Sequence, residues 1–428
     1  MTNSVFGTDG IRGIYGKTLT TETAYALGFA LGKRGNVLIG ADNRPSSPAL
    51  SAATAAGVED AGGSAFFIGT ITTPALYFLL TRRSEDYAVM VTASHNPPAY
   101  NGLKVFSREG KLSEEIRRDL SREMSVVTVG RRAFPNPCPH ADPLREYEEF
   151  LLERVGILKG LTVVVDHAGG ASGVFSDLLS RTGARVIPLH LRVSGDRINE
   201  GCGALHPEAC AEETMRSGAD LGIALDGDGD RVIAVTKKGE LLDGDALTFL
   251  FACRMKARGT LKHDKTVLTV MTNSGVLKSL SDRGIGAITC AVGDSAVCDA
   301  MRAEDLNLGG EQSGHIILGD HLMTGDGLLV GAMLLKSLRE EGEIAADEIP
   351  VRYPQVLLNV PVGDKSVAYD PAVQALAAEL KREWKEGRIL VRASGTESLV
   401  RVMTEHPREE EARRAAEMLR EEIGKRRL

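Results

Sequence analysis

Residues 221–231 read Leu-Gly-Ile-Ala-Leu-Asp-Gly-Asp-Gly-Asp-Arg, an apolar run followed by three acids at alternate positions. The apolar part predicts a buried strand. Alternate side chains lie on one side of an extended backbone, and the intervening glycines let it curl, so Asp226, Asp228 and Asp230 can converge. Three close anions repel one another unless a hard divalent cation binds them, and oxygen ligands suit Mg²⁺. The stretch predicts one magnesium ion per chain, with Arg231 as a fixed positive charge beside it.

Two other interpretations of this stretch can be weighed against the magnesium site. A calcium loop of the EF-hand type needs Gly at its sixth position and Glu at its twelfth. Those positions hold Arg231 and Lys237, so that interpretation is excluded. A solvated acidic turn between two strands remains open, because Gly and Asp are common turn residues.

A second buried strand is predicted at residues 87–92, and it ends in Ala-Ser-His-Asn-Pro-Pro at 93–98. In open α/β sheets, functional groups gather beyond the carboxyl ends of strands. Ser94 is therefore a candidate nucleophile or phosphate carrier, with His95 beside it and Lys104 shortly after it. A simple Ser/Asn/Pro turn is the alternative. The sequence contains no Gly-x-Ser-x-Gly elbow, Walker loop or dinucleotide fingerprint.

Two strands predicted at 388–392 and 398–403 flank the loop Ala-Ser-Gly-Thr-Glu at 393–397. Hydroxyls and free backbone amides in such a loop favour phosphate, and flanking arginines can grip it. An ordinary hairpin loop with surface arginines is the alternative. The candidate phosphate clamp consists of Arg392, Ser394, Gly395, Thr396 and Arg401.

A glycine-rich segment at 309–315 precedes the apolar Ile-Ile-Leu at 316–318. Glu311, Ser313 and His315 stand at alternate positions, so they can face one side together. A carboxylate, a hydroxyl and an imidazole suit sugar hydroxyls or an amine. A glycine-rich turn leading into a strand is the alternative.

Five segments of the chain together resemble the α-D-phosphohexomutase superfamily, and the first looks most like that of bacterial phosphoglucosamine mutases. Each is weak alone, but five in order across the chain make coincidence very improbable. The segments are residues 6–13 (Phe-Gly-Thr-Asp-Gly-Ile-Arg-Gly), 92–97 (Thr-Ala-Ser-His-Asn-Pro), 226–231, 310–315 and 392–397.

The resemblance implies an α/β protein of four domains around a central cleft: three similar mixed α/β domains and a smaller α+β C-terminal domain. Proline-rich residues 134–143 and the strands that follow mark out the boundaries. The expected units are a phosphoserine domain at 1–140, a metal-binding domain at 145–243, a sugar-recognition domain at 244–349 and a phosphate-clamp domain at 350–428.

The resemblance also implies the chemistry. Ser94 would carry a phosphoryl group, and Asp226, Asp228 and Asp230 would hold Mg²⁺ together with an oxygen of that phosphoserine. The expected reaction interconverts glucosamine-6-phosphate and glucosamine-1-phosphate through a bisphosphorylated sugar and supplies UDP-N-acetylglucosamine synthesis. A sugar bisphosphate activator is also expected.

Further roles follow from the matched motifs. Glu311, Ser313 and His315 would read the sugar, and the clamp would hold the non-reacting phosphate in both orientations. Arg12, His95 and Lys104 match positions near the reacting phosphate. Lys104 is the candidate general acid/base, provided that nearby cations lower its pKa toward neutrality.

The chain departs from the family pattern in several places. Ala393 and Ser398 replace two prolines of the clamp, and Ser295 stands where phosphoglucosamine mutases usually carry Arg. Residues 97–101 are closer to the phosphomannomutase/phosphoglucomutase form. Glucose or mannose phosphates therefore remain alternative substrates. From other classes, the alternatives are a metal-dependent sugar phosphatase with Asp226 as nucleophile and a non-catalytic sugar-phosphate sensor.

The composition fits a multidomain enzyme: 428 residues, of which 43% are hydrophobic and 25% charged. The net charge of −7 argues against a general nucleic-acid binder. Six cysteines without Cys-x-x-Cys spacing favour free thiols in a reducing compartment. The sequence has no long apolar run, so we expect no membrane span and a cytoplasmic location. The expected protein is a monomer or homodimer that binds a small hexosamine phosphate and no nucleic acid.

Overall fold

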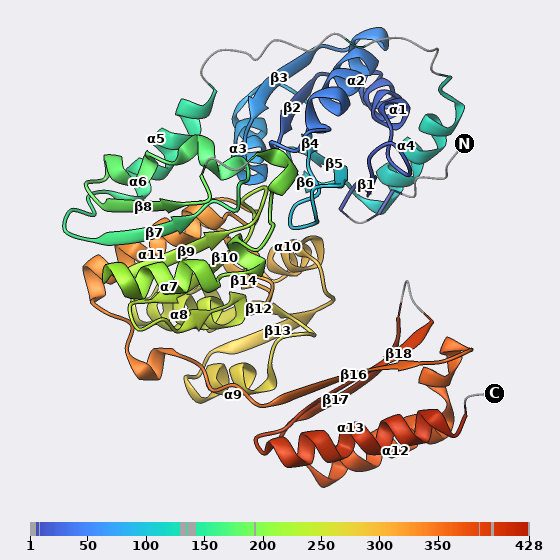
Figure 1. The fold of residues 1–428 in the computed structure, drawn as a ribbon, viewed down its shortest axis with the longest axis vertical. Helices are drawn as coiled ribbons and strands as arrows, with labels where there is room; N and C mark the ends of the chain where they lie inside the picture. The colour runs from blue at the N-terminus through green and yellow to red at the C-terminus, as the bar shows by residue number, and fades with distance from the viewer. Residues whose placement is uncertain are drawn as a thin grey trace.

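The computed structural model describes residues 6–7, 9–128, 134, 143–191, 194–384, 386–394 and 398–426. Four β-sheets follow one another along the chain, and each has its own helices (Figure 1). The predicted architecture is confirmed, with three mixed α/β units followed by a smaller antiparallel unit. We call them the first to fourth units.

The first sheet has the strand order β1-β5-β4-β2-β3, with β6 beside β5. Parallel pairing of β2 with β3 and β4 is combined with antiparallel pairing of β5. Because strand side chains alternate, Val37 and Ile39 join one apolar cluster with α1 and α2, while Leu38 joins another with α3. The elements are β1 (Ile11–Ile14), α1 (Thr21–Gly32), β2 (Val37–Ala41), α2 (Ser47–Asp60), β3 (Ala65–Thr70), α3 (Thr73–Arg82), β4 (Tyr87–Val91), β5 (Tyr100–Ser107), β6 (Gly110–Lys111) and α4 (Glu114–Val126).

The second sheet has the order β11-β10-β9-β7-β8, and the third has the order β13-β12-β14-β15. Their elements are α5 (Leu144–Val155), β7 (Thr162–Asp166), α6 (Leu178–Arg181), β8 (Arg185–Leu189), α7 (Glu208–Ser217), β9 (Leu221–Leu225), β10 (Val232–Thr236), β11 (Leu241–Leu242), α8 (Gly244–Ala257), β12 (Lys265–Thr269), α9 (Ser274–Asp282), β13 (Gly286–Cys290), α10 (Asp294–Ala303), β14 (Leu308–Gly310), β15 (Ile316–Leu318) and α11 (Gly327–Glu341).

Helix α11 follows the third sheet in the sequence but packs against β9, β10 and α5 of the second unit. Helix α5 in turn contacts α3 of the first unit, where Tyr147 and Phe150 meet the ring of Phe78. One apolar cluster therefore runs through the first three units. Burial of this shared surface fixes the three units against one another, because the hydrophobic effect favours its removal from water.

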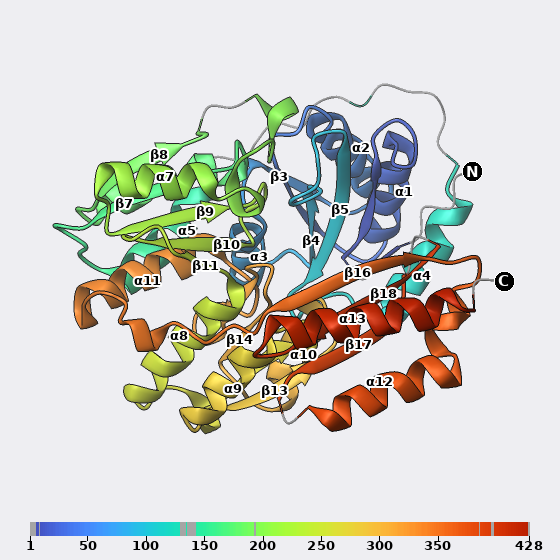
Figure 2. The ribbon, with the colours of Figure 1, turned by 60° about the horizontal axis from the view of Figure 1, so that its bottom comes forward.

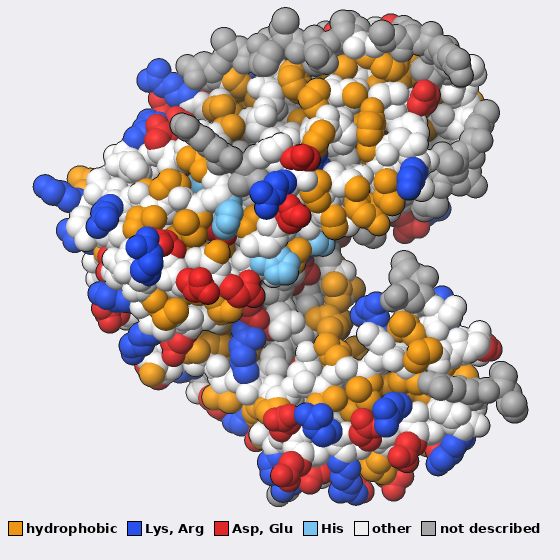
Figure 3. Space-filling model, viewed as in Figure 1, with side chains coloured by type: hydrophobic (Ala, Val, Ile, Leu, Met, Phe, Trp, Pro, Cys, Tyr) orange, Lys and Arg blue, Asp and Glu red, His pale blue; other side chains and the backbone are white. Residues whose placement is uncertain are grey.

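The fourth unit is an antiparallel sheet of order β16-β18-β17 with two helices along one side (Figure 2). Its elements are β16 (Gln355–Pro361), α12 (Pro371–Glu383), β17 (Arg388–Ala393), β18 (Leu399–Glu405) and α13 (Glu409–Gly424). An open hollow separates this unit from the first on the face shown in Figure 3. No helix within the described ranges is both long and apolar enough to span a bilayer.

Short 3₁₀ segments complete the described structure. They are η1 (Ala171–Phe175), η2 (Gly195–Arg197), η3 (Gly203–Leu205), η4 (Lys262–Asp264), η5 (Ala346–Glu348) and η6 (Lys365–Tyr369).

Candidate active site

Ser94 lies in the connection between β4 and β5, where the first sheet faces the second unit. Its side chain is buried, and its backbone N–H donates to Thr92 Oγ1 at 2.9 Å. The Ser94 hydroxyl donates to Asp226 Oδ2 at 2.7 Å and lies 3.2 Å from Nδ1 of His95. The predicted serine and the predicted metal loop therefore meet, although they belong to different sheets.

The loop after β9 gathers its three acids as the sequence predicts. Ligand atoms of Asp226, Asp228 and Asp230 lie within 4.8 Å of one another, and all three residues are buried. The backbone curls rather than extends, because Gly229 has φ +73°. Gly227 is needed for a second reason: a Cβ there would lie 2.8 Å from the carbonyl oxygen of Ser94. The glycines thus let the loop approach the serine closely.

One ammonium group and one hydroxyl group donate hydrogen bonds to the carboxylates of Asp228 and Asp230. Lys104 Nζ donates to Asp228 Oδ2 at 2.8 Å and to Asp230 Oδ2 at 2.7 Å. Thr73, the first residue of α3, donates its hydroxyl to Asp228 Oδ2 at 2.5 Å and its N–H to the carbonyl oxygen of Asp228. Asp228 Oδ1 and Asp230 Oδ1 are buried and have no hydrogen-bond partner within the described residues. These two oxygens, with Asp226, fit a hard divalent cation such as Mg²⁺.

Charge and burial set the protonation of the loop. Burial raises the pKa of Asp226 well above its ordinary value, and the neighbouring Asp230 and Asp228 raise it further. Burial acts the same way on Asp230, but Lys104, His315 and Arg231 outweigh it and hold the pKa of Asp230 well below its usual range. A divalent cation would remove the conflict that Asp226 faces, since it stabilises the carboxylate form.

The condition attached to the expectation for Lys104 is not met in the metal-free protein. A general acid/base at this position required nearby cations to lower its pKa. Burial does act to lower the pKa of Lys104, but Asp228, Asp230 and Asp9 outweigh it and raise that pKa well above its ordinary value. The groups that face Lys104 in the metal-free protein are anions, and they favour its ammonium form. Its role as the general acid/base stays a prediction.

His95 has the opposite electrostatic environment. Burial lowers its pKa to about 4, and the nearby Arg231 and Arg12 add to the effect. The imidazole is therefore neutral at pH 7 and able to accept a proton. Arg12 donates to the side chain of Asn96 at 2.8 Å and to Asp9 at 2.8 Å, so it lies beside the segment that carries Ser94.

Arg231 stands beside the acids in the predicted place. Its backbone N–H donates to Asp226 Oδ1 at 3.2 Å, and its Nε lies 3.9 Å from Asp230 Oδ1.

The segment around Glu311 forms the tight turn between β14 and β15, and it is not an extended run with alternating side chains. Ser313 is exposed on this turn, whereas Glu311 and His315 are buried. His315 Nδ1 lies 4.0 Å from Asp230 Oδ2, and its Nε2 accepts from the N–H of Gly325 at 3.1 Å. The turn therefore joins the metal loop through His315, while Ser313 points to solvent.

The clamp residues lie on the fourth unit. Arg392 and Arg401 face each other across the pair of β17 and β18, and Ser394 N–H closes the hairpin on the carbonyl oxygen of Leu399 at 2.9 Å. Lys365 donates to the carbonyl oxygen of Ser394 at 3.1 Å. Gly395 and Thr396 lie outside the described residues. The hairpin borders the hollow between the fourth and first units (Figures 1 and 3).

A bridge between the first and third units escaped the sequence analysis. The ammonium of Lys111 contacts both Asp9 and Asp294, and Asp294 Oδ2 lies 3.9 Å from His315 Nε2. Burial opposes ionisation of Asp294, but the Lys111 ammonium outweighs it, and the pKa of Asp294 falls to about 2. A cavity of about 560 Å³ opens beside this bridge, lined among others by Ser295. Asp294 directly precedes Ser295, one of the departures from the family pattern, but no local pattern marks Lys111.

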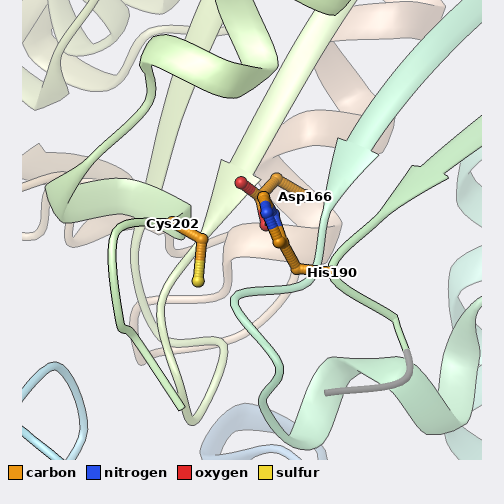
Figure 4. A group of neighbouring side chains, drawn as sticks. All are labelled: Asp166, His190 and Cys202. Carbon is orange, nitrogen blue, oxygen red and sulfur yellow. The ribbon is translucent and has the colours of Figure 1, made fainter. Parts of the chain in front are cut away.

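A second group of possible metal ligands consists of Asp166, His190 and Cys202 (Figure 4). Both oxygens of Asp166 are already engaged: Oδ1 accepts from Ala168 N–H at 2.9 Å and lies 3.0 Å from His190 Nδ1, and Oδ2 accepts from Gly203 N–H at 2.9 Å. Burial raises the pKa of the Cys202 thiol to about 11, so it stays protonated at pH 7. We assign this group a structural role.

Comparison with known proteins places this geometry in a family. Models of the phosphoglucomutase/phosphomannomutase family match four successive parts of the chain: alpha/beta/alpha domain I at residues 3–127, domain II at 145–239, domain III at 243–356 and the C-terminal domain at 357–422.

Curated relatives and solved structures agree with these matches. The chain is 39% identical to phosphoglucosamine mutase of Limosilactobacillus fermentum, covering 95% of this chain and 94% of that one. It is 41% identical to phosphoglucosamine mutase of Symbiobacterium thermophilum, covering 94% of each. A family protein from Burkholderia thailandensis superposes with a TM-score of 0.83 at 25% identity, over 99% of this chain and 97% of that one.

The fold also matches a more distant structure, Aspergillus fumigatus N-acetylphosphoglucosamine mutase in complex with GlcNAc-6P and magnesium, with a TM-score of 0.65 at 18% identity over 99% and 96% of the two chains. The chain belongs to the phosphoglucomutase/phosphomannomutase family, together with the bacterial phosphoglucosamine mutases.

Proposed function

We propose that the chain is a phosphoglucosamine mutase, an isomerase that interconverts glucosamine-6-phosphate and glucosamine-1-phosphate. The observation that carries this proposal is the contact of Ser94 Oγ with Asp226 at 2.7 Å, in a site where Lys104 bridges Asp228 and Asp230. A serine hydroxyl beside a carboxylate cluster suits a residue that carries a phosphoryl group, because a divalent cation held by these carboxylates, together with Lys104, would neutralise the charge of that group.

In the proposed reaction, phosphorylated Ser94 gives its phosphoryl group to the free hydroxyl of the hexosamine monophosphate, which yields a bisphosphorylated sugar. The sugar turns over without leaving, and the other phosphoryl group returns to Ser94. A hexose bisphosphate would first load the serine. Mg²⁺ bound by Asp226, Asp228, Asp230 and an oxygen of the phosphoserine would neutralise charge on the transferring group.

The remaining charges have distinct roles in this proposal. Lys104, held as an ammonium, contacts oxygens of the transferring group together with Arg12. Lys104 stays the proposed general acid/base, and His95, neutral at pH 7, lies beside the Ser94 hydroxyl. The clamp of Arg392, Ser394, Gly395, Thr396 and Arg401 holds the non-reacting phosphate, and Arg231 adds positive charge beside the metal.

Sugar recognition rests on the turn between β14 and β15. Glu311 offers a buried carboxylate to the substrate amine, Ser313 reaches it from the exposed tip, and His315 orients the turn against Asp230. Similarity to phosphoglucosamine mutases supports glucosamine, and not glucose or mannose, as the sugar of the substrate. Ser295, which departs from the family pattern, lines the cavity beside Lys111.

The proposed enzyme acts in the cytoplasm as a monomer or homodimer. The five cysteines within the described residues are all free thiols, as a reducing compartment favours.

A substrate-competition assay tests the proposal. Protein loaded with a hexose 1,6-bisphosphate and Mg²⁺ is given glucosamine-6-phosphate, glucose-6-phosphate and mannose-6-phosphate, with Ser94→Ala as the control. The highest kcat/KM is expected for glucosamine-6-phosphate, with no turnover by Ser94→Ala. Preference for glucose or mannose would overturn the sugar assignment, undiminished turnover by Ser94→Ala would overturn the phosphoserine mechanism, and stoichiometric phosphate release would indicate a phosphatase.

A further inference from the structure

Ser94 has a backbone conformation that an L-residue adopts at a cost in free energy. Its φ is +52°, in the left-handed region that favours glycine. Such conformations persist only where the surroundings hold them in place. The groups that hold Ser94 therefore help to decide where its hydroxyl, and the phosphoryl group on it, will lie.

Arg44, from the first unit, supplies one part of this support. The guanidinium is buried and donates to the carbonyl oxygens of Ser94 at 2.7 Å and Asn96 at 2.8 Å. Asp42 fixes the guanidinium by accepting from its Nε at 2.8 Å. Because Arg44 belongs to the same unit as Ser94, it shapes the serine segment but does not relate it to the metal loop.

Asn199 supplies the part that crosses between units. Its Nδ2 donates to the carbonyl oxygen of Ser94 at 2.8 Å and lies 3.3 Å from that of Asn96. Asn199 is buried and has φ +61°, a conformation that Asn tolerates better than most residues. The Asn199 side chain, from the second unit, thus donates to the same two carbonyl oxygens as Arg44, which belongs to the first unit.

The loop that carries Asn199 is itself tied to the second unit. Asn199 N–H donates to the carbonyl oxygen of Ala168 at 2.9 Å, and the loop is held again at Gly203 by Asp166 (Figure 4). The buried carboxylate of Asp166 also holds the turn at Ala168. Asn199 therefore moves with the second unit, which also carries Asp226.

We propose that Asn199 is a positioning residue for phosphoryl transfer: it fixes the backbone of Ser94 to the unit that carries the metal loop. The transferring group sits between Ser94 and the three acids, so a small shift between the two units misaligns it. Positioning of this kind contributes to the rate without adding a contact to the substrate. This inference rests on the function proposed above.

Two variants separate the hydrogen bond from folding. Asn199→Asp keeps the shape and tolerates the left-handed backbone but removes the Nδ2 donor, and Asn199→Gly removes the side chain without backbone strain. Asn307→Asp is the control: Asn307 is also buried, and its Nδ2 donates to the carbonyl oxygen of Thr260 at 2.8 Å and to Asp320 Oδ2 at 2.6 Å, so this variant should lose stability but not kcat. We expect kcat to fall 10- to 100-fold in both Asn199 variants, with KM within threefold.

Phosphate release and hydrogen exchange complete the test. Misaligned phosphoserine should lose a larger share of its phosphoryl groups to water per turnover, and peptides covering residues 92–101 should exchange deuterium faster. The control should change neither quantity, whatever its thermal stability. Unchanged exchange in these peptides, or kcat that falls only with the folded fraction, would overturn the inference. Because exchange needs no turnover, absence of mutase activity in the parent protein would count against the proposed function alone.

Discussion

Lys104 Nζ lies 2.7 Å from Oδ2 of Asp230, and both side chains are almost fully buried. The lysine comes from β5 of the first unit and the aspartate from the metal loop of the second, so the ion pair spans the interface at the centre of the site. The same ammonium contacts Asp228. In the protein without a divalent cation, Lys104 therefore provides much of the positive charge that holds these carboxylates together.

Replacing Lys104 with Met should destabilise the metal-free protein by about 3 kcal/mol, because loss of one partner leaves buried charge uncompensated. Under the proposed function Mg²⁺ would bind the same carboxylates, so it should restore more stability to the variant than to the parent. The thermal midpoint of each protein is measured in EDTA and in excess Mg²⁺. Turnover should fall at least about a hundredfold, since a charge aimed at the transferring group is lost.

Lys336→Met is the matched control for this experiment. Lys336 donates to the carbonyl oxygen of Arg154 at 2.7 Å, on a part-buried surface of α11. Its variant should show the parent's response to Mg²⁺. An equal Mg²⁺ response in Lys104→Met and the parent would contradict the role of Lys104.

Thr73→Val should weaken Mg²⁺ binding about tenfold, because groups that orient a metal ligand typically contribute that much. The substitution keeps the shape but removes the hydroxyl that donates to Asp228 Oδ2. Titration calorimetry with Mg²⁺ measures the effect. Thr54→Val is the control, since the buried Thr54 hydroxyl donates only to the carbonyl oxygen of Leu50 within α2. Equal Mg²⁺ affinity in both variants would show that Thr73 does not orient Asp228.

Much of the candidate site could be predicted because its reactive residues lie in short contiguous motifs. Asp226, Asp228 and Asp230 follow a buried strand that the apolar run at 221–225 identifies, and Ser94 follows another. A strand end fixes where such side chains emerge, so local pattern and position in the fold agree.

The supporting contacts could not be predicted, because they depend on how the units meet. Asn199 reaches Ser94 across an interface, and Lys111 bridges two acids from different units. Nothing near either residue in the sequence marks it. The raised pKa of Lys104 in the metal-free protein was likewise hidden, because Asp228 and Asp230 beside it come from the loop that it faces.

The path of α11 was equally hidden from the sequence. Its apolar face is evident from Gly327–Glu341, but periodicity does not say which sheet the face covers. The helix crosses to the second sheet, where Gly331 allows close contact with Ile223.

Asp326→Asn should flatten the pH dependence of stability between about pH 4 and 6. Asp326 caps α11, and burial raises its pKa to about 6 although Leu329 N–H and Tyr147 hydroxyl donate to it. The unfolded carboxyl titrates near pH 3.9, so between these values the folded protein binds the extra proton. Stability from this group therefore falls as pH rises from about 4 to 6, by up to about 3 kcal/mol.

Asn keeps a cap oxygen but carries no charge. The variant should equal the parent near pH 4 and match or exceed its stability at pH 7, as measured by urea unfolding across this range. If the variant equals the parent at pH 4 but is less stable than the parent at pH 7, the ionised carboxylate stabilises the helix.

Gly195→Ala tests the packing of the Asn199 loop on the first unit. A Cβ at Gly195 would lie 1.7 Å from the carbonyl oxygen of Asn43, a backbone atom next to Arg44. The loop must therefore move, which should cost about 1–3 kcal/mol of unfolding free energy. Since the movement draws Asn199 away from Ser94, kcat should fall as well.

Gly363→Ala is the control, because a Cβ there meets no atom within 4 Å. Its unfolding free energy and kcat should stay close to those of the parent. The two losses in Gly195→Ala should appear together, because one displacement causes both. Lower stability with unchanged kcat would mean that the serine segment keeps its position without the loop, and that Arg44 alone is sufficient to hold it.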